Sequence, residues 1–113
     1  MLQNKKTLVL GATPKPERYA YLATEMLEDY KHCVLPFGVR KGAIGEVAIL
    51  NEWPRDNDID TATLYINPNR QKDFYDRILT SKPKRIIFNP GTENPELQRL
   101  ADANDIVTQK ALL

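Results

Sequence analysis

The sequence predicts an α/β fold built on a parallel β-sheet with helices on both faces. Short apolar runs alternate with amphipathic stretches along the chain, a pattern typical of βαβ units. The first run, "LVL" at 8–10, contains no polar residue and suits a strand buried on both faces. Right-handed crossovers leave few arrangements of such units. We therefore expect a three-layer, Rossmann-like, doubly wound parallel sheet of about five strands.

The first part of the chain predicts two strands and one helix. The run at 8–10 stops at Gly11, and apolar residues then recur at spacings of three and four over 19–30, which predicts a helix with one buried face. Pro14 or Pro16 can occupy the first turn of this helix, and Glu17 would lie near its positive end. A second apolar run at 33–35 is closed by Pro36.

The remaining elements follow the same alternation. Residues 61–66, "TATLYI", predict a third strand, the apolar positions at 74–79 a helix, and "RIIF" at 85–88 a fourth strand. Asn94, Pro95 and Glu96 form a helix start with an N-cap, a first-turn proline and a first-turn acid. Residues 106–107 predict a short last strand. Residues 38–58 have the least periodicity and predict a long surface connection.

Length and composition limit the classes of protein that fit. The 113 residues suffice for one domain, which we expect over residues 1–113, and are too few for two. A net charge of +1 gives no field that attracts nucleic acid or an anionic membrane, so we expect neither as a partner. No apolar stretch is long enough for a membrane span or a signal peptide. A lone cysteine, Cys33, allows no internal disulfide, which suits a cytoplasmic location.

The carboxyl ends of the predicted strands indicate where a ligand would bind. In open parallel sheets the ligand lies beyond these ends, at the point where the strand order reverses. Each predicted strand end is a small, polar or proline-containing turn with almost no acid. These turns are Gly11-Ala12-Thr13, Pro36-Phe37-Gly38, Asn67-Pro68-Asn69 and Asn89-Pro90-Gly91.

The turn after the first strand favours a phosphate or pyrophosphate. Gly11 lets the backbone approach a ligand closely, and the following helix offers unpaired N–H groups and a partial positive charge. Thr13 can add a hydroxyl, and Arg18 a guanidinium that grips phosphate oxygens. However, "GATPKP" has only the first glycine of a dinucleotide fingerprint, so a plain tight turn is an alternative interpretation.

The turn after the second strand lacks the acid that an NAD site uses for the ribose hydroxyls. Arg40 and Lys41 follow it instead. A cationic pair near the ribose suits a phosphorylated ribose, as in coenzyme A or NADP. The alternative is that both cations are solvated loop charges.

The string "KKTLVLGATPKPERYAYLATEML" resembles the opening of the small bacterial CoA-binding-domain proteins. These are stand-alone relatives of the CoA-binding domain of succinyl-CoA synthetase α subunits. These relatives share the pattern G-x-[ST]-x-x-P-x-R-x-[SA]. Its fixed positions are matched here by Gly11, Thr13, Pro16, Arg18 and Ala20. The later strings "VLPFG" and "TLYINPNRQKDFYDRILTSKPKRIIFNPGTENPEL" also resemble this family. The resemblance extends from about residue 6 to residue 106 and depends on the order and spacing of these motifs together.

The resemblance implies a role for each matching position. Gly11, Ala12 and Thr13 would hold the pyrophosphate, with Arg18 reaching phosphate or fixing the loop. Phe37 and Gly38 would border the adenosine, with Arg40 and Lys41 near its ribose phosphate. The full set of implied binding residues is Gly11, Ala12, Thr13, Pro16, Arg18, Tyr19, Pro36, Phe37, Gly38, Arg40, Lys41, Asn67, Pro68, Asn89, Pro90 and Gly91.

The chain departs from the family at its end, "TQKALL", where relatives often carry a cysteine-containing segment. We expect the final edge strand to be short or unpaired. A homodimer contact is one way to cover such an edge.

Other chemistry-bearing residues have plainer interpretations. His32 and Cys33 precede the second strand, at the end opposite the predicted site, so we interpret Cys33 as a small core residue rather than a nucleophile. We expect Asp56, Asp58 and Asp60 to lie in a solvated loop before a strand rather than to bind a divalent cation. No metal is therefore expected.

Three aromatic residues near the predicted site also need interpretation. Trp53 is expected to anchor the long loop, although capping a ligand is an alternative. Tyr19 and Tyr21 flank the phosphate loop. We expect one to face the core and the other to cover the cleft.

The leading hypothesis is a non-catalytic module that binds coenzyme A or an acyl-CoA through its nucleotide part. No nucleophile–base pair is visible at the predicted site, which favours a binding protein over an enzyme. One alternative is a subunit of an NADP-dependent oxidoreductase. Another is a regulatory protein-binding module with a vestigial nucleotide cleft.

Overall fold

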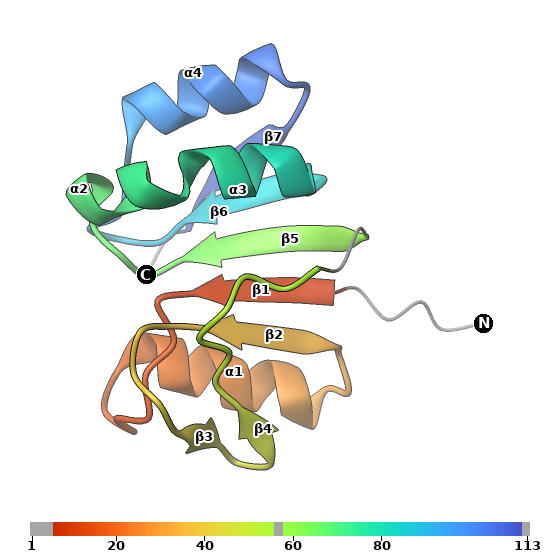
Figure 1. Cartoon of the computed structure of the whole chain (residues 1–113), viewed down its shortest axis with the longest axis vertical. Coiled ribbons are helices and arrows are strands. Elements are labelled where there is room, and N and C mark those ends of the chain that lie inside the picture. Colours follow the sequence, from red (N-terminus) through yellow and green to blue (C-terminus); the bar gives the residue numbers. More distant parts are fainter. Residues whose placement is uncertain (1–5, 56–57, 112–113) are drawn as a thin grey trace.

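The computed structural model describes residues 6–55 and 58–111, and its centre is a five-stranded sheet (Figure 1). The order of the strands is β2-β1-β5-β6-β7, and every neighbouring pair is parallel. This confirms the predicted doubly wound parallel sheet. The strands are β1 (Lys6–Leu10), β2 (Val34–Phe37), β5 (Ile59–Leu64), β6 (Arg85–Phe88) and β7 (Val107–Lys110).

The helices cover opposite faces of the sheet and form the two outer layers (Figure 1). Alternation along β1 separates the faces, because successive side chains of a strand point to opposite sides. Leu8 and Leu10 join a core cluster with Leu97 and Ala101, whereas Val9 joins a second cluster with Ala20. The helical elements are α1 (Tyr19–Asp29), α2 (Pro68–Gln71), η1 (Lys72–Phe74), α3 (Tyr75–Ser81) and α4 (Pro95–Ala103).

The strand order places a topological switch point at β1. From β1 the chain passes through α1 to β2 on one side, and β5 lies on the other side of β1. The loops that follow β1, β2 and β5 therefore open a crevice at their carboxyl ends, where ligands bind in this class of sheet.

Two edge strands differ from the expectation. β2 continues through Pro36 to Phe37 instead of stopping before the proline. Proline has no N–H to donate, and it is tolerated there because β2 is an edge strand, which pairs with a neighbouring strand on one side only. β7 is four residues long and pairs with β6 along its whole length, so the last strand is short, as expected, but it is not unpaired.

The segment after β2 is more ordered than the predicted loop. It forms a small antiparallel hairpin of β3 (Ala43–Ile44) and β4 (Val47–Ala48). Ile44 is fully buried in the cluster that contains Ala20 of α1. These strands have only two residues each, which is too short for an alternating pattern to be recognised.

The loop beyond the hairpin is anchored by Trp53, as expected. Its ring contacts the rings of Phe37 and Phe74, with centroids 5.1 Å and 6.0 Å away. Its Nε1 donates to Ser81 Oγ at 3.0 Å. Asp56 of the predicted acidic loop lies outside the described residues. No helix in the described part of the chain has the length and hydrophobicity required to span a bilayer.

Candidate functional site

A cavity of about 380 Å³ opens at the carboxyl ends of β1, β2 and β5. It lies at the switch point and is bordered by the loops after these strands, by the start of α1, and by residues after β6. Its lining residues are Leu10, Gly11, Ala12, Thr13, Lys15, Arg18, Tyr19, Ala20, Phe37, Gly38, Val39, Arg40, Tyr65, Ile66, Arg70, Phe74, Pro90 and Thr92.

The cavity brings together nine of the sixteen residues predicted from the sequence. These are Gly11, Ala12, Thr13, Arg18, Tyr19, Phe37, Gly38, Arg40 and Pro90. The other seven lie outside its lining: Pro16, Pro36, Lys41, Asn67, Pro68, Asn89 and Gly91. Every strand end named in the prediction except the one after β5 therefore contributes at least one of these residues.

The turn after β1 is tied to the end of β2. The N–H groups of Gly11 and Ala12 both donate to the carbonyl of Phe37 at 2.9 Å. Gly38 fits closely beneath them, because a Cβ at this position would lie 2.1 Å from the carbonyl oxygen of Ala12. The amides of Gly11 and Ala12 are thus already hydrogen-bonded within the protein. Gly38 is required for the close packing of the two loops rather than for contact with a ligand.

The N-terminus of α1 faces the cavity without a side-chain cap. Arg18 is the N-cap residue and makes no capping hydrogen bond, and the first turn contains no acid. Tyr19 and Ala20, the first two residues of the helix, line the cavity. Both prolines before the helix lie in the preceding loop rather than in its first turn. An uncapped helix start offers N–H groups and a partial positive charge to an anion.

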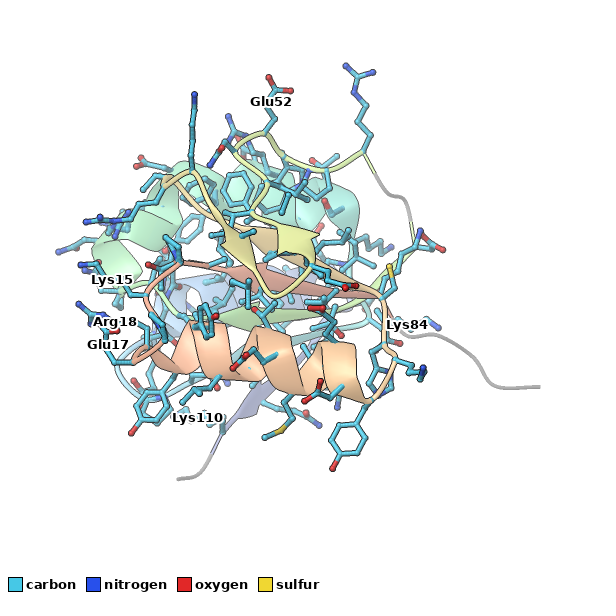
Figure 2. All side chains as sticks on the ribbon, turned by 90° about the horizontal axis from the view of Figure 1, so that it is seen from below. Lys15, Glu17, Arg18, Glu52, Lys84 and Lys110 are labelled. Carbon is cyan, nitrogen blue, oxygen red and sulfur yellow. The ribbon has the colours of Figure 1, made fainter. Side chains whose placement is uncertain are left out.

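Four cationic side chains and no acidic side chain belong to the cavity lining. Lys15 and Arg18 come from the loop before α1, Arg40 from the loop after β2, and Arg70 from α2. Figure 2 shows Lys15 and Arg18 together at one end of α1, with Lys84 at the opposite side of the molecule. The arrangement makes the cavity strongly electropositive, although the whole chain has a net charge of only +1.

The loop that carries Arg40 is held by one side chain. Asn51 Nδ2 donates to the carbonyls of Gly38 and Arg40, at 2.8 Å and 3.1 Å. The N–H of Gly38 also donates to the carbonyl of Leu50. These bonds fix the backbone of Arg40 while its exposed side chain stays free to reach a ligand.

A buried polar network supports the wall that carries Arg70 and Thr92. Gln71 is fully buried, and its Nε2 donates to the carbonyls of Ile66 and Thr92, at 2.9 Å and 2.8 Å. Asn94 Nδ2 donates to Gln71 Oε1 at 2.9 Å and to the Tyr75 hydroxyl at 2.7 Å. The network joins the loops after β5 and β6, so it sets the distance between two parts of the cavity wall.

Two predicted asparagines serve the backbone of the same region. Asn67 caps α2, accepting a hydrogen bond from the N–H of Arg70 at 3.0 Å. Asn89 Nδ2 donates to Thr63 Oγ1 and to the carbonyl of Leu64, both at 2.8 Å. Neither residue lines the cavity, but these contacts orient the loops that follow β5 and β6.

The tyrosines divide as expected. Tyr19 lines the cavity and is 66% exposed, whereas Tyr21 packs against the core cluster of α1. Tyr65, which the prediction missed, also lines the cavity. Its partial burial raises the pKa of its hydroxyl, an effect partly offset by a hydrogen bond with Thr63. The Tyr65 hydroxyl is therefore neutral at physiological pH and can donate a hydrogen bond.

The residues read as structural lie away from the cavity. Cys33 is partly exposed just before β2, so it is not a fully buried core residue. Asp58 pairs with Lys6, whose hydrogen bond lowers the pKa of that carboxyl. Asp60 accepts a hydrogen bond from Thr61 Oγ1 at 2.7 Å. Among residues 6–55 and 58–111, no three metal-ligating side chains are grouped to hold an ion.

Comparison with known proteins identifies the family. The model of a CoA binding domain matches residues 5–111. The chain belongs to the CoA binding domain family. A search of the curated proteins finds no match to the chain.

Solved structures share the fold of this chain. The crystal structure of an uncharacterized protein is 49% identical, with a TM-score of 0.92, and the match covers 97% of this chain and 91% of that one. A conserved hypothetical protein from Pyrococcus furiosus has the same fold at 21% identity, with a TM-score of 0.79 and 98% and 96% coverage. An oxidoreductase from Bacillus cereus is 14% identical, with a TM-score of 0.59, and the match covers 94% of this chain but 34% of that one.

Proposed function

We propose that the protein binds coenzyme A or an acyl-CoA through its nucleotide part, as a stand-alone, non-catalytic module. The observation that carries the proposal is the switch-point cavity, which has four cationic side chains and no acidic one. CoA has a pyrophosphate and a 3′-phosphate, so its charge complements this lining. Membership of the CoA binding domain family supports the same ligand.

The cavity suggests a place for each phosphate. The pyrophosphate would lie against Thr13 and the uncapped start of α1, with Arg18 beside it, because the amides of Gly11 and Ala12 are already bonded to Phe37. The 3′-phosphate would lie near Arg40, after β2, where dinucleotide-binding sheets hold the ribose. Lys41 is outside the cavity lining, so of the predicted cationic pair only Arg40 would act directly.

The composition of the lining supports binding rather than catalysis. It contains no carboxylate, histidine or cysteine, the groups that most often act as general bases or nucleophiles. NADP remains the competing ligand, since its 2′-phosphate would also suit Arg40. The Bacillus cereus oxidoreductase shares the fold alone at 14% identity, so it does not favour NADP over CoA.

Thermal shift and calorimetric titration with CoA, dephospho-CoA, NADP and NAD test the proposal. A ligand that binds only the folded state raises its melting temperature. We expect CoA to bind more tightly than dephospho-CoA, and Arg40→Gln to remove that preference by weakening CoA binding about tenfold. Lys41 and Arg99 lie outside the cavity lining, so Lys41→Gln and Arg99→Gln should leave the affinity for CoA unchanged. Binding of NADP alone would instead support an oxidoreductase subunit, and binding of none would favour a protein-binding module.

A further inference from the structure

The outer side of α1 carries an apolar stripe made of Tyr19, Leu22, Met26 and Tyr30. These side chains are 66%, 46%, 60% and 73% exposed. Their spacings of three, four and four place them along one side of the helix. They account for four of the six large hydrophobic residues that are exposed in the described part of the chain. Such residues are normal when scattered, but a contiguous set marks an interaction surface.

The stripe lies on a side of α1 that no other element of residues 6–55 and 58–111 covers. Ala20 and Thr24 face the sheet and are buried. Glu28 faces the β3–β4 hairpin, because its Oε1 accepts a hydrogen bond from the N–H of Glu46 at 3.4 Å. At 100° per residue, the stripe lies on the flank opposite Glu28. The hairpin lies beyond β2 in Figure 1, so this flank is turned toward the other half of the sheet.

That half of the sheet is also open on the α1 side. Ile86 and Phe88 of β6 point into the core cluster that contains α3 and α4 residues, so Arg85 and Ile87 point to the α1 side. Val107 of β7 is level with Arg85 in the parallel register and is 58% exposed. Among the described helices, only α1 packs on this face, so a partner has room beside it.

We propose that the stripe is the contact between two copies of this chain, with the α1 helices packed antiparallel across a two-fold axis. The stripe is self-complementary in this arrangement, as an isologous interface requires. Tyr19 of one copy would lie against Tyr30 of the other, and Leu22 against Met26, in both halves of the contact. An aromatic side chain at each end and an aliphatic pair in the middle give the same sequence of contacts in either direction.

Charge and area support a second copy as the occupant. The loop entering α1 carries Lys15, Glu17 and Arg18, with a net charge of +1, whereas Glu28, Asp29 and Lys31 at the other end of the helix have a net charge of −1. Antiparallel packing brings the cationic end of one helix to the acidic end of the other and aligns the helix dipoles favourably. Since an aromatic side chain carries about 150–250 Å² of surface, the stripe exposes on the order of 400 Å² per copy. Two stripes with a polar rim reach the roughly 1,000 Å² of a specific interface.

Sedimentation velocity of the full chain tests the proposal. At 100 μM we expect a species of twice the 12.9 kDa chain mass, and at least a tenfold weaker self-association in Leu22→Glu/Met26→Glu. Neither residue lines the cavity, so CoA binding by this variant reports separately on the proposed function. Arg99→Glu on α4 is the control; it changes the charge by two units away from the stripe and should still dimerise. A monomeric wild type, or a dimer that both glutamates leave intact, would overturn the proposal.

Disulfide trapping tests the antiparallel register itself. In a Cys33→Ser background, Leu22→Cys and Met26→Cys chains are mixed and oxidised. We expect the mixture to give a covalent dimer at least fivefold faster than either chain alone. Equal rates in the mixture and in the separate chains would contradict this register.

Discussion

At the scale of single residues, Gly38 shows how closely the loops of the cavity are packed. Its N–H donates to the carbonyl of Leu50, and its carbonyl accepts a hydrogen bond from Asn51. A Cβ at this position would lie 2.1 Å from the carbonyl oxygen of Ala12, so the neighbour that must move is backbone rather than a flexible side chain. The turn after β1 and the turn after β2 therefore behave as one unit.

We expect Gly38→Ala to lower the free energy of unfolding by about 2–4 kcal/mol, because one added methyl group must displace this backbone. Chemical denaturation measures the change. Gly91→Ala is the matched control: Gly91 has a φ of +88°, but a Cβ there would meet no atom within 4 Å. Its cost should be only the backbone strain of about 1–2 kcal/mol. A larger loss at Gly91 than at Gly38 would show that loop packing is not what Gly38 protects.

At the scale of the element, α4 begins with a cap that also belongs to the buried network. Asn94 Oδ1 accepts a hydrogen bond from the N–H of Leu97, and Asn94 Nδ2 donates to Gln71 and Tyr75. The start of α4 is thereby joined to α2, which carries Arg70. The position of this cavity wall depends on α4, although no residue of α4 lines the cavity.

Asn94→Ala should lower the free energy of unfolding by about 2–4 kcal/mol, since it removes a cap and leaves the buried Gln71 amide oxygen without its partner. Asn67→Ala removes the cap of α2, where the residue is exposed, and should cost about 1 kcal/mol. Denaturation curves of both variants are compared. Curves of Asn94→Ala, Tyr75→Phe and the double variant Tyr75→Phe/Asn94→Ala give the coupling energy between Tyr75 and Asn94. Equal losses for the two caps would mean that the network contributes little.

These elements also show how far the sequence predicts the fold. The cap, first-turn proline and first-turn acid of α4 are local signals, and Asn94, Pro95 and Glu96 were confirmed in these positions. The alternation of strands and helices was confirmed, because β1, β2 and β6 each contain a short apolar run that marks a buried strand. The β3–β4 hairpin was missed, since two-residue strands have no period. Pro36 was wrongly taken as the end of β2, because the sequence does not reveal which strands lie at an edge.

The cavity was predicted in part, for a reason that is also physical. The rule of strand ends points to backbone turns, so Gly11, Thr13 and Arg40 could be named from their order in the sequence. Arg70 lies six residues beyond the end of β5, on α2, and Gln71 sets its wall through contacts with distant loops. An exposed arginine on a short helix resembles a solvated charge until the fold brings it to the cavity.

At the scale of the whole molecule, charge is distributed unevenly. Sixteen lysines and arginines nearly balance fifteen acids, but the cavity lining holds four of the cations and none of the acids. The binding of an anionic ligand should therefore be electrostatic in origin and local to one end of the sheet. Ions of the solvent screen such attraction, with a Debye length of about 10 Å at 0.1 M salt.

We expect CoA affinity to fall as salt is raised from 50 to 500 mM, and Arg70→Gln to weaken CoA binding about three- to tenfold and flatten this salt dependence, because one of four cavity cations is removed. Calorimetric titration at several salt concentrations measures both effects. Arg99→Gln lowers the net charge of the chain equally but lies on α4, outside the cavity. If Arg99→Gln weakened binding as much as Arg70→Gln, the attraction would come from the overall charge of the molecule. A loss confined to Arg70→Gln would assign it to the cavity.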